Sequence, residues 1–136
     1  MSISNKDIDQ IVSLLSKQVA NLEGVYLFGS CLTEFFTTAS DIDIAVKATN
    51  RIEIQTLWEL RNMLANTLKR EIDLVDLSVA DTVLRMQVIS TGSRVFTSNF
   101  KKSEAWDSLV FSMYLQLNDD RREILKEIVS SGRVYG

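Results

Sequence analysis

The chain has 136 residues, of which 46% are hydrophobic and 24% charged, a composition that is typical of a folded globular protein and excludes a disordered or fibrous chain. Fifteen lysines and arginines against eighteen aspartates and glutamates give a net charge of -3, so direct binding to nucleic acid is not expected. With no histidine and a single cysteine, Cys31, the sequence excludes histidine-dependent triads, the usual zinc sites and an internal disulfide.

The length suits a single minimal domain, which we expect to span residues 1–136. Residues 1–9 lack the basic start and apolar core of a signal peptide, and no window approaches the roughly 18 apolar residues of a membrane span. We therefore expect a cytoplasmic protein that does not contact membranes.

The first part of the chain predicts one helix and two strands. Apolar residues recur at helical spacing from Ser4 onward and predict an amphipathic helix that ends near Gly24, with Ser4 and Asp7 placed like a capping box. Residues 25–28 and 41–46 are typical of strands, and a polar, threonine-rich loop separates them.

A second helix is expected to begin at Asn50 and Glu53, and residues 71–77 predict a third strand. The helix should present one apolar stripe to the core. Its members are Ile54, Leu57, Trp58, Leu64, Ala65 and Leu68.

Ser78 and Asp81 predict the cap of a shorter helix that runs to about Ser90 and stops at Gly92. Residues 94–96 then predict a small edge strand.

The rest of the chain predicts two helical stretches with a polar break at residues 118–120. The apolar face of the first stretch is expected to be core rather than interface; it comprises Trp106, Leu109, Val110, Met113 and Leu117. The second stretch has apolar residues at 124, 125 and 128. The whole order of elements predicts an α+β or α/β fold, a sheet covered by helices.

A candidate site begins where the first strand ends. Gly29 and Ser30 close that strand, and Asp41-Ile42-Asp43 opens the next one after ten residues. Residues two apart on a strand point to the same face, so Asp41 and Asp43 lie side by side, whereas Ile42 points into the core. Two adjacent carboxylates repel each other unless a hard divalent cation neutralises them. The pair therefore predicts a magnesium site.

A third carboxylate, Asp73, stands inside an apolar strand, where a charge needs a specific reason. If that strand lies beside the strand of Asp41, the acids converge and can hold two magnesium ions, roughly 3.5 to 4 Å apart, that grip a triphosphate. Gly29 lets backbone amides turn toward phosphate oxygens, and Ser30 adds a hydroxyl donor.

The pair Gly29-Ser30, the ten-residue gap, Asp41 to Asp43 and the later Asp73 within an apolar strand resemble the signature of the nucleotidyltransferase (DNA polymerase beta-like) superfamily. The length resembles that of the minimal nucleotidyltransferases, the MNT proteins that act as antitoxins beside HEPN-domain toxins in type VII-like pairs. By motif the resemblance spans residues 25–77, and by size and helix order it extends to the whole chain.

The resemblance implies a mixed-sheet nucleotidyltransferase fold, with ATP and two Mg2+ ions as the donor system and a tyrosine hydroxyl of the toxin as acceptor. It implies that the toxin, an RNase, is silenced by AMP attachment. It also implies that Asp41 and Asp43 bind both metals, that Asp73 holds the catalytic metal near the attacking hydroxyl, and that Gly29 and Ser30 contact the phosphates.

One feature departs from that superfamily, in which many members carry an arginine soon after the Gly-Ser pair. Residues 31–40 contain no basic residue, so the metals, Lys47, Arg85 or the partner remain as sources of positive charge for the triphosphate. Little of the chain lies outside the nucleotide core to build a deep acceptor pocket, which favours a protein acceptor.

Two alternatives stay open: an antitoxin that blocks its toxin sterically without catalysis, and a small-molecule nucleotidyltransferase of the aminoglycoside-modifying kind.

Among other residues near the motif, Cys31 is expected to be a spacer, because no histidine is present to activate a thiol. Asp76 is expected to have a surface or capping role. Phe35 and Phe36 either line the site or pack the loop against the sheet.

Overall fold

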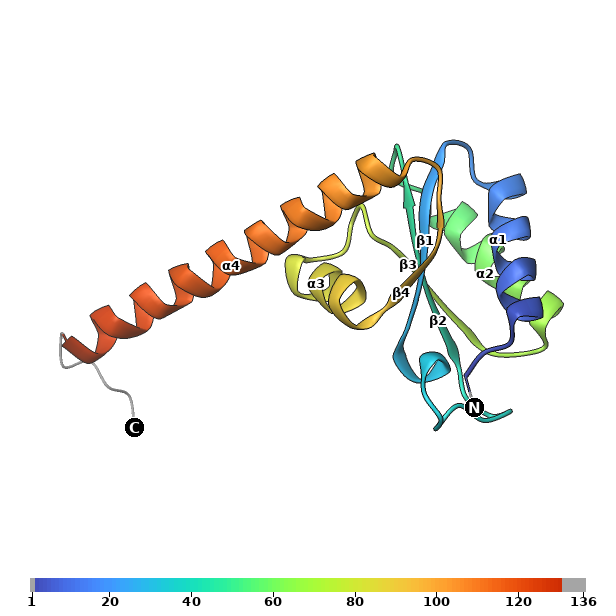
Figure 1. The fold of residues 1–136 in the computed structure, drawn as a ribbon, viewed down its shortest axis with the longest axis horizontal. Coiled ribbons are helices and arrows are strands. Elements are labelled where there is room, and N and C mark those ends of the chain that lie inside the picture. Colours follow the sequence, from blue (N-terminus) through green and yellow to red (C-terminus); the bar gives the residue numbers. More distant parts are fainter. Residues whose placement is uncertain (1, 131–136) are drawn as a thin grey trace.

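The structure is a computed structural model that describes residues 2–130, with side chains described through residue 122. Its elements in chain order are α1 (Asn5–Gln18), β1 (Leu22–Phe28), the 3-10 turn η1 (Gly29–Leu32), β2 (Ile42–Ala48), α2 (Ile54–Leu68), β3 (Ile72–Asp76), α3 (Thr82–Thr91), β4 (Ser93–Thr97) and α4 (Phe100–Ser130). Figure 1 shows a sheet with helices on both sides and α4 projecting from the body. This arrangement confirms the predicted α+β fold.

The strands lie in the order β3-β2-β1-β4. β1 runs antiparallel to both of its neighbours, β2 and β4, whereas β2 and β3 are parallel. A parallel pair needs a crossover connection, and α2 supplies it between β2 and β3. The edge strand expected near residues 94–96 is confirmed as β4.

The two faces of the sheet bury different side chains. On one face, Ile42 and Ile44 of β2 join residues of α1 and α2 in a large core cluster. On the opposite face, Tyr26, Phe28 and Ala45 form a second cluster with residues of α3 and the start of α4. Figure 1 shows the same two layers, α1 and α2 on one side of the sheet and α3 and α4 on the other. The odd-numbered side chains of β2 therefore lie on the α3–α4 face.

Two predicted caps are confirmed. The Ser4 hydroxyl accepts a hydrogen bond from the backbone N–H of Asp7 at 3.2 Å, at the start of α1. The Asp81 carboxylate accepts one from the N–H of Leu84 at 2.8 Å, at the start of α3. Both bonds satisfy an N–H that has no partner within its helix. The predicted end of α3 at Gly92 is confirmed as well.

The end of α1 differs from the prediction. The helix ends at Gln18 rather than near Gly24, and β1 already begins at Leu22. Asn21 lies between them with a φ of 56°, a left-handed conformation that asparagine tolerates better than most residues and that turns the chain. Leu22 fits the helical spacing but is buried in the sheet, so its apolar character reflects a strand.

The start of α2 also differs. The helix begins at Ile54, and Glu53 before it makes no side-chain capping bond, so the predicted opening at Asn50 is wrong. The segment that enters α2 is held by Asp76, whose carboxylate accepts a hydrogen bond from the N–H of Ile52 at 2.8 Å. Asp76 is only 2% exposed, which excludes the surface role. It does not cap a helix either, because the N–H groups that its carboxylate binds, those of Ile52 and Ser78, lie outside the helices.

The predicted stripe of α2 is only partly correct. Leu60 and Leu64 are buried, whereas Ile54 and Trp58 are 82% and 57% exposed. Residues 54 and 58 are neighbours on one face of the helix, and the core meets the adjacent face. Ile54 and Trp58, in the first turns of α2, fit the apolar spacing of the sequence although they do not lie on the buried side of the helix.

The predicted break at residues 118–120 is wrong, because α4 is one continuous helix from Phe100 to Ser130. Asparagine and aspartate each cost less than about 1 kcal/mol inside a helix, and no glycine or proline is present to stop it. The side chains of the predicted second stretch, at residues 124, 125 and 128, lie outside the described side chains. Within residues 2–130, no helix is long and apolar enough to cross a membrane.

The predicted core face of α4 is also wrong over most of its length. Val110 is buried and Trp106 is half-buried, but Leu109 and Met113 are exposed. The cause is visible in Figure 1, where α4 extends well beyond α3 and the sheet. The apolar spacing correctly identifies an apolar side of α4, but the described part of the chain does not cover that side.

Candidate active site

The pairing of β2 with β3 brings two predicted site residues together. In this parallel pair Asp43 lies directly opposite Asp73, and Asp41 stands one residue before β2 begins. Asp43 and Asp73 share the α3–α4 face, because their neighbours Ile42 and Ile72 point into the core on the other side. The sequence predicts that the acids converge only if their two strands are neighbours, and the pairing of β2 with β3 meets this condition.

The three carboxylates influence one another electrostatically. Burial raises the pKa of Asp43, and the negative charges of Asp73 and then Asp41 raise it further. Asp43 is half-buried, whereas Asp41 and Asp73 are exposed. Like charges at short range favour the protonated form unless a counter-charge is supplied, so this corner of the sheet is suited to a cation.

Gly29 lies against the middle of this group. Phe28, just before it, is paired with Asp43, and η1 starts immediately at Gly29. The φ of Gly29 is +75°, and a Cβ atom at this position would lie 2.1 Å from Oδ2 of Asp43. Both the backbone conformation and the close approach require glycine.

Ser30 follows on the exposed first turn of η1. Its carbonyl oxygen accepts hydrogen bonds from the N–H and the hydroxyl of Thr33, at 3.0 and 2.9 Å, which fix the turn. Cys31 is buried behind this turn, and its thiol donates to the carbonyl of Phe28 at 3.3 Å. Burial raises the pKa of the Cys31 thiol, so the residue stays protonated and serves packing.

The oxygen ligands that the three aspartates offer are of the kind that binds magnesium. Hard oxygen ligands are those that Mg2+ prefers, and Asp41, Asp43 and Asp73 supply three carboxylates from two adjacent strands. Among the side chains that the structure describes, no three acidic, histidine or cysteine groups already converge on one point. Rotation of exposed aspartate side chains is therefore needed to complete a cage.

Lys47 and Arg85, the two candidate sources of positive charge within the chain, are engaged elsewhere. Lys47 lies four residues along β2 from Asp43, and its Nζ contacts Oε1 of Glu23 and the carbonyl of Ala48, each at 2.9 Å. The Arg85 guanidinium donates two hydrogen bonds of 2.8 Å to carbonyl oxygens beyond β3, at residues 77 and 78. Neither cation is directed at the three acids.

The structure reveals a basic residue near the site that sequence reasoning missed. Nη1 of Arg70 donates to the carbonyl oxygens of Thr37 and Ser40, at 2.6 and 3.2 Å, and its guanidinium lies 4.2 Å from the centre of the Phe36 ring. Arg70 thus holds the loop that leads into Asp41. No local signal could identify it, because the contact joins segments about thirty residues apart.

The two phenylalanines of this loop differ. Phe36 packs against the core cluster beneath Arg70, which confirms the packing alternative for this residue. Phe35 is 76% exposed at the loop surface.

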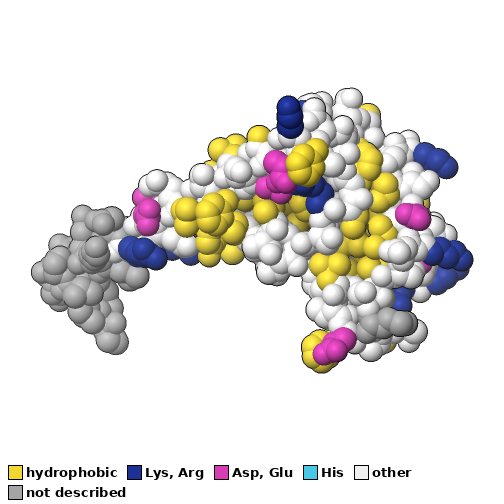
Figure 2. All heavy atoms as spheres, in the orientation of Figure 1, with side chains coloured by type: hydrophobic (Ala, Val, Ile, Leu, Met, Phe, Trp, Pro, Cys, Tyr) yellow, Lys and Arg dark blue, Asp and Glu magenta, His cyan; other side chains and the backbone are white. Residues whose placement is uncertain are grey.

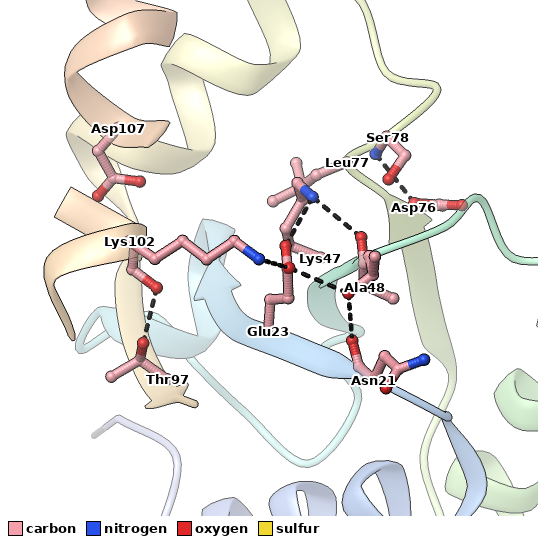
Figure 3. Close-up of polar contacts among 12 residues, drawn as sticks. Asn21, Glu23, Lys47, Ala48, Asp76, Leu77, Ser78, Thr97, Lys102 and Asp107 are labelled. Carbon is pink, nitrogen blue, oxygen red and sulfur yellow. Dashed lines mark hydrogen bonds and ion pairs between the residues drawn. The ribbon is translucent and has the colours of Figure 1, made fainter. Parts of the chain in front are cut away.

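At the other end of the sheet, polar contacts anchor α4. Figure 3 shows Glu23 of β1 between Lys47 of β2 and Lys102 of α4, and both lysines form ion pairs with it. Burial tends to raise the pKa of Glu23, but hydrogen bonds from Lys102, Lys47 and Thr49 outweigh it and lower the pKa to about 2. This cluster joins two strands and a helix through one carboxylate.

A second anchor lies one turn further along α4. Asp107 accepts a hydrogen bond from the hydroxyl of Tyr26 at 2.9 Å and pairs with Arg94 of β4 at 3.0 Å. Burial raises the pKa of the Tyr26 hydroxyl, and the hydrogen bond to Asp107 adds to this effect. The start of α4 is therefore fixed on the α3–α4 face by β1 and β4 together.

Comparison with known proteins identifies relatives along most of the chain. The family model for Polymerase beta, Nucleotidyltransferase matches residues 9–101. The protein adenylyltransferase MntA of Shewanella oneidensis is 34% identical over 123 residues, which cover 90% of this chain and 88% of MntA.

Solved structures identify the same relatives as the sequence comparisons do. A complex of the tri-AMPylated Shewanella oneidensis HEPN toxin with its MNT antitoxin contains a chain 33% identical to this one, with a TM-score of 0.78 over 93% of this chain and 99% of that chain. A toxin-antitoxin complex with AMP-PNP gives 34% identity and a TM-score of 0.80 over 90% and 98%. A spectinomycin adenyltransferase, AAD(9) of Enterococcus faecialis, has 16% identity and a TM-score of 0.56 over 71% and 57%, so it shows the fold alone. The chain belongs to the polymerase beta nucleotidyltransferase family and, within it, is a homologue of the MNT antitoxin MntA.

Proposed function

We propose that this protein is the antitoxin of a toxin-antitoxin pair and a magnesium-dependent protein adenylyltransferase. It transfers AMP from ATP to a tyrosine hydroxyl of its cognate HEPN toxin and so neutralises the toxin. The observation that carries the proposal is the register that sets Asp43, two residues after Asp41, opposite Asp73 and beside Gly29. The homology to MntA supports the same acceptor class.

In this proposal Asp41 and Asp43 would hold two Mg2+ ions, and Asp73 would help to hold one of them. When bound, the ions neutralise phosphate charge and activate the attacking oxygen. Gly29 and Ser30 would contact the phosphates through the backbone of the turn that follows β1 and through the Ser30 hydroxyl, and this turn lies directly against Asp43.

The transfer itself is an in-line displacement at the α-phosphorus of ATP. The tyrosine oxygen forms the new bond to the α-phosphorus, the bond from that phosphorus to pyrophosphate breaks, and the phenolic proton passes to solvent water on the side of Asp73. The chain's own work is to hold the acids rigidly on two paired strands and to keep Asp43 partly shielded from water.

The test uses purified toxin, α-labelled ATP and magnesium. We expect label on the toxin with the natural chain, and at least about a hundredfold slower transfer with Asp41→Asn or Asp73→Asn, because each removes one charged metal ligand. Asp9→Asn, an exposed change on α1, is the matched control and should transfer label normally. Transfer that is unaffected by Asp41→Asn would contradict the proposal.

The same assay separates the alternatives. If Asp43→Asn leaves both toxin neutralisation and toxin binding intact, the protein is a steric antitoxin without catalysis. If pyrophosphate is released with an aminoglycoside-type acceptor and no toxin, it is a small-molecule nucleotidyltransferase. A single-domain organisation over residues 1–136, a cytoplasmic location and the absence of nucleic-acid and membrane binding stay predictions.

A further inference from the structure

The projecting part of α4 exposes apolar side chains on two sides. Leu109 and Met113 are neighbours one turn apart, and so are Phe111 and Leu115, yet the two pairs lie on nearly opposite faces of the helix. All four are between 44% and 56% exposed. A helix that is exposed to water ordinarily keeps one polar face, and one that is apolar on opposite faces is normally covered.

This surface is visible in Figure 2, where apolar side chains gather on the helix that extends from the body. Among the described side chains of α4, only Ser103 and Val110 are buried. The body of this chain therefore does not provide the cover.

The direction of the helix is fixed before it leaves the body. Lys102 is paired with Glu23 of β1, and Asp107 with Arg94 of β4 and Tyr26 of β1. A surface held in one orientation loses little conformational entropy when it binds a partner. The anchors at the start of α4 thus favour a rigid docking element.

The exposed helix and the three acids belong to the same side of the sheet. Trp106 of α4 packs with the cluster of Tyr26 and Ala45, the face to which Asp43 and Asp73 also belong. In Figure 1, α3 lies between the projecting helix and the body of the sheet on this side. A protein seated on α4 therefore lies on the same side of the sheet as the acids.

We propose that the exposed apolar side chains of α4 form the docking surface for the toxin that presents the acceptor tyrosine, through an apolar surface of that toxin. These side chains are Leu109, Phe111, Met113 and Leu115. This inference rests on the proposed function, which requires a protein acceptor. The choice of occupant is supported by a solved structure in which a chain similar to this one over 93% of its length is in complex with a HEPN toxin. In this proposal α4 binds the toxin, and the three aspartates carry out AMP transfer to it.

The test compares the double variant Phe111→Glu/Leu115→Glu with Ile54→Glu. Ile54 is an exposed apolar residue on α2, which covers the opposite face of the sheet, so its replacement makes a matched change away from the surface. Toxin affinity is measured by calorimetry without nucleotide. We expect the double variant to bind about tenfold or more weakly and Ile54→Glu to bind normally.

The same variants are then assayed for AMP transfer over a range of toxin concentrations. We expect the double variant to raise the KM for toxin in proportion to the lost affinity, with kcat at saturating toxin close to that of the natural chain. Asp41→Asn should do the reverse, binding toxin normally while losing transfer. Failure of the proposed chemistry is thereby distinguished from failure of the docking surface.

Hydrogen exchange on the natural chain provides a second measurement that does not depend on the folding of a variant. Amides of residues 109–115 should become protected when toxin is added. Unchanged affinity of the double variant, or unchanged exchange in this segment, would overturn the proposal. So would a dimer of the isolated chain that the double variant dissociates, because a second copy would then be the occupant of α4.

Discussion

Gly29 and Asp43 are in such close contact that a Cβ atom on residue 29 would lie 2.1 Å from Oδ2 of Asp43. Gly29 also has a φ of +75°, a conformation that costs other residues roughly 1 to 2 kcal/mol. The turn and the acid therefore constrain each other, and the side chain of Asp43 keeps its place only while residue 29 has none.

Replacement of Gly29 by alanine should affect catalysis more than stability. We expect kcat/KM for AMP transfer to fall at least about a hundredfold, because Asp43 must move from its position. The free energy of unfolding should fall by about 1 to 2 kcal/mol from backbone strain. Transfer rates and urea unfolding measure the two effects. Gly24→Ala, at a position where a Cβ would meet its nearest atom at 3.4 Å, is the control and should transfer AMP far better.

Arg70 should position the loop that carries Asp41. Arg70→Lys keeps the positive charge but loses the planar stacking on Phe36 and the two hydrogen bonds that Nη1 donates to the loop carbonyls. We expect kcat/KM for AMP transfer to fall about tenfold through a lower kcat, so a higher ATP concentration should not restore the rate. Arg51→Lys, an exposed change before α2, should have no effect. Equal activities of the two variants would show that Arg70 does not position the site.

Asp76 should be important for folding and not for chemistry. Its buried carboxylate accepts hydrogen bonds from the N–H groups of Ile52 and Ser78, at 2.8 and 2.9 Å. Asp76→Ala leaves both donors without this acceptor and should lower the free energy of unfolding by about 2 to 4 kcal/mol. Urea denaturation measures this loss, and Asp9→Ala serves as the exposed control. A loss below about 0.5 kcal/mol would contradict this structural role of the Asp76 carboxylate.

The Glu23 cluster should make stability depend on acid pH. Because the pKa of Glu23 falls from 4.5 to about 2 on folding, its ionised form stabilises the protein above pH 4.5, and this contribution is lost as the pH falls toward 2. We expect Glu23→Gln to lower the free energy of unfolding by about 1 to 2 kcal/mol at pH 7, after solvent screening of the exposed Lys102 is taken into account. The difference from the natural chain should shrink below pH 4.5. A difference that stays constant between pH 6 and pH 3 would contradict this assignment.

Features that depend on neighbouring residues were correctly predicted. Ser4 and Asp81 cap their helices, and Ile42 and Ile44 point into the core, because capping and strand alternation act over a few positions. The errors occur where the same apolar pattern fits two structures. Leu22 fits the spacing of α1 but belongs to β1, and the apolar side of α4 marks a surface rather than the core.

Local patterns were enough to identify the chemical groups of this protein: a glycine-serine turn, two acids at alternate strand positions and a third acid in a later strand. Three features became known from the folded chain: β3 pairs with β2 so that Asp73 faces Asp43, Arg70 reaches the loop before Asp41, and most of α4 extends beyond the body. The pairing of Asp43 with Asp73 and the contact of Arg70 with Ser40 each join residues 30 positions apart, and the free energy of such contacts depends on the whole fold rather than on any local pattern.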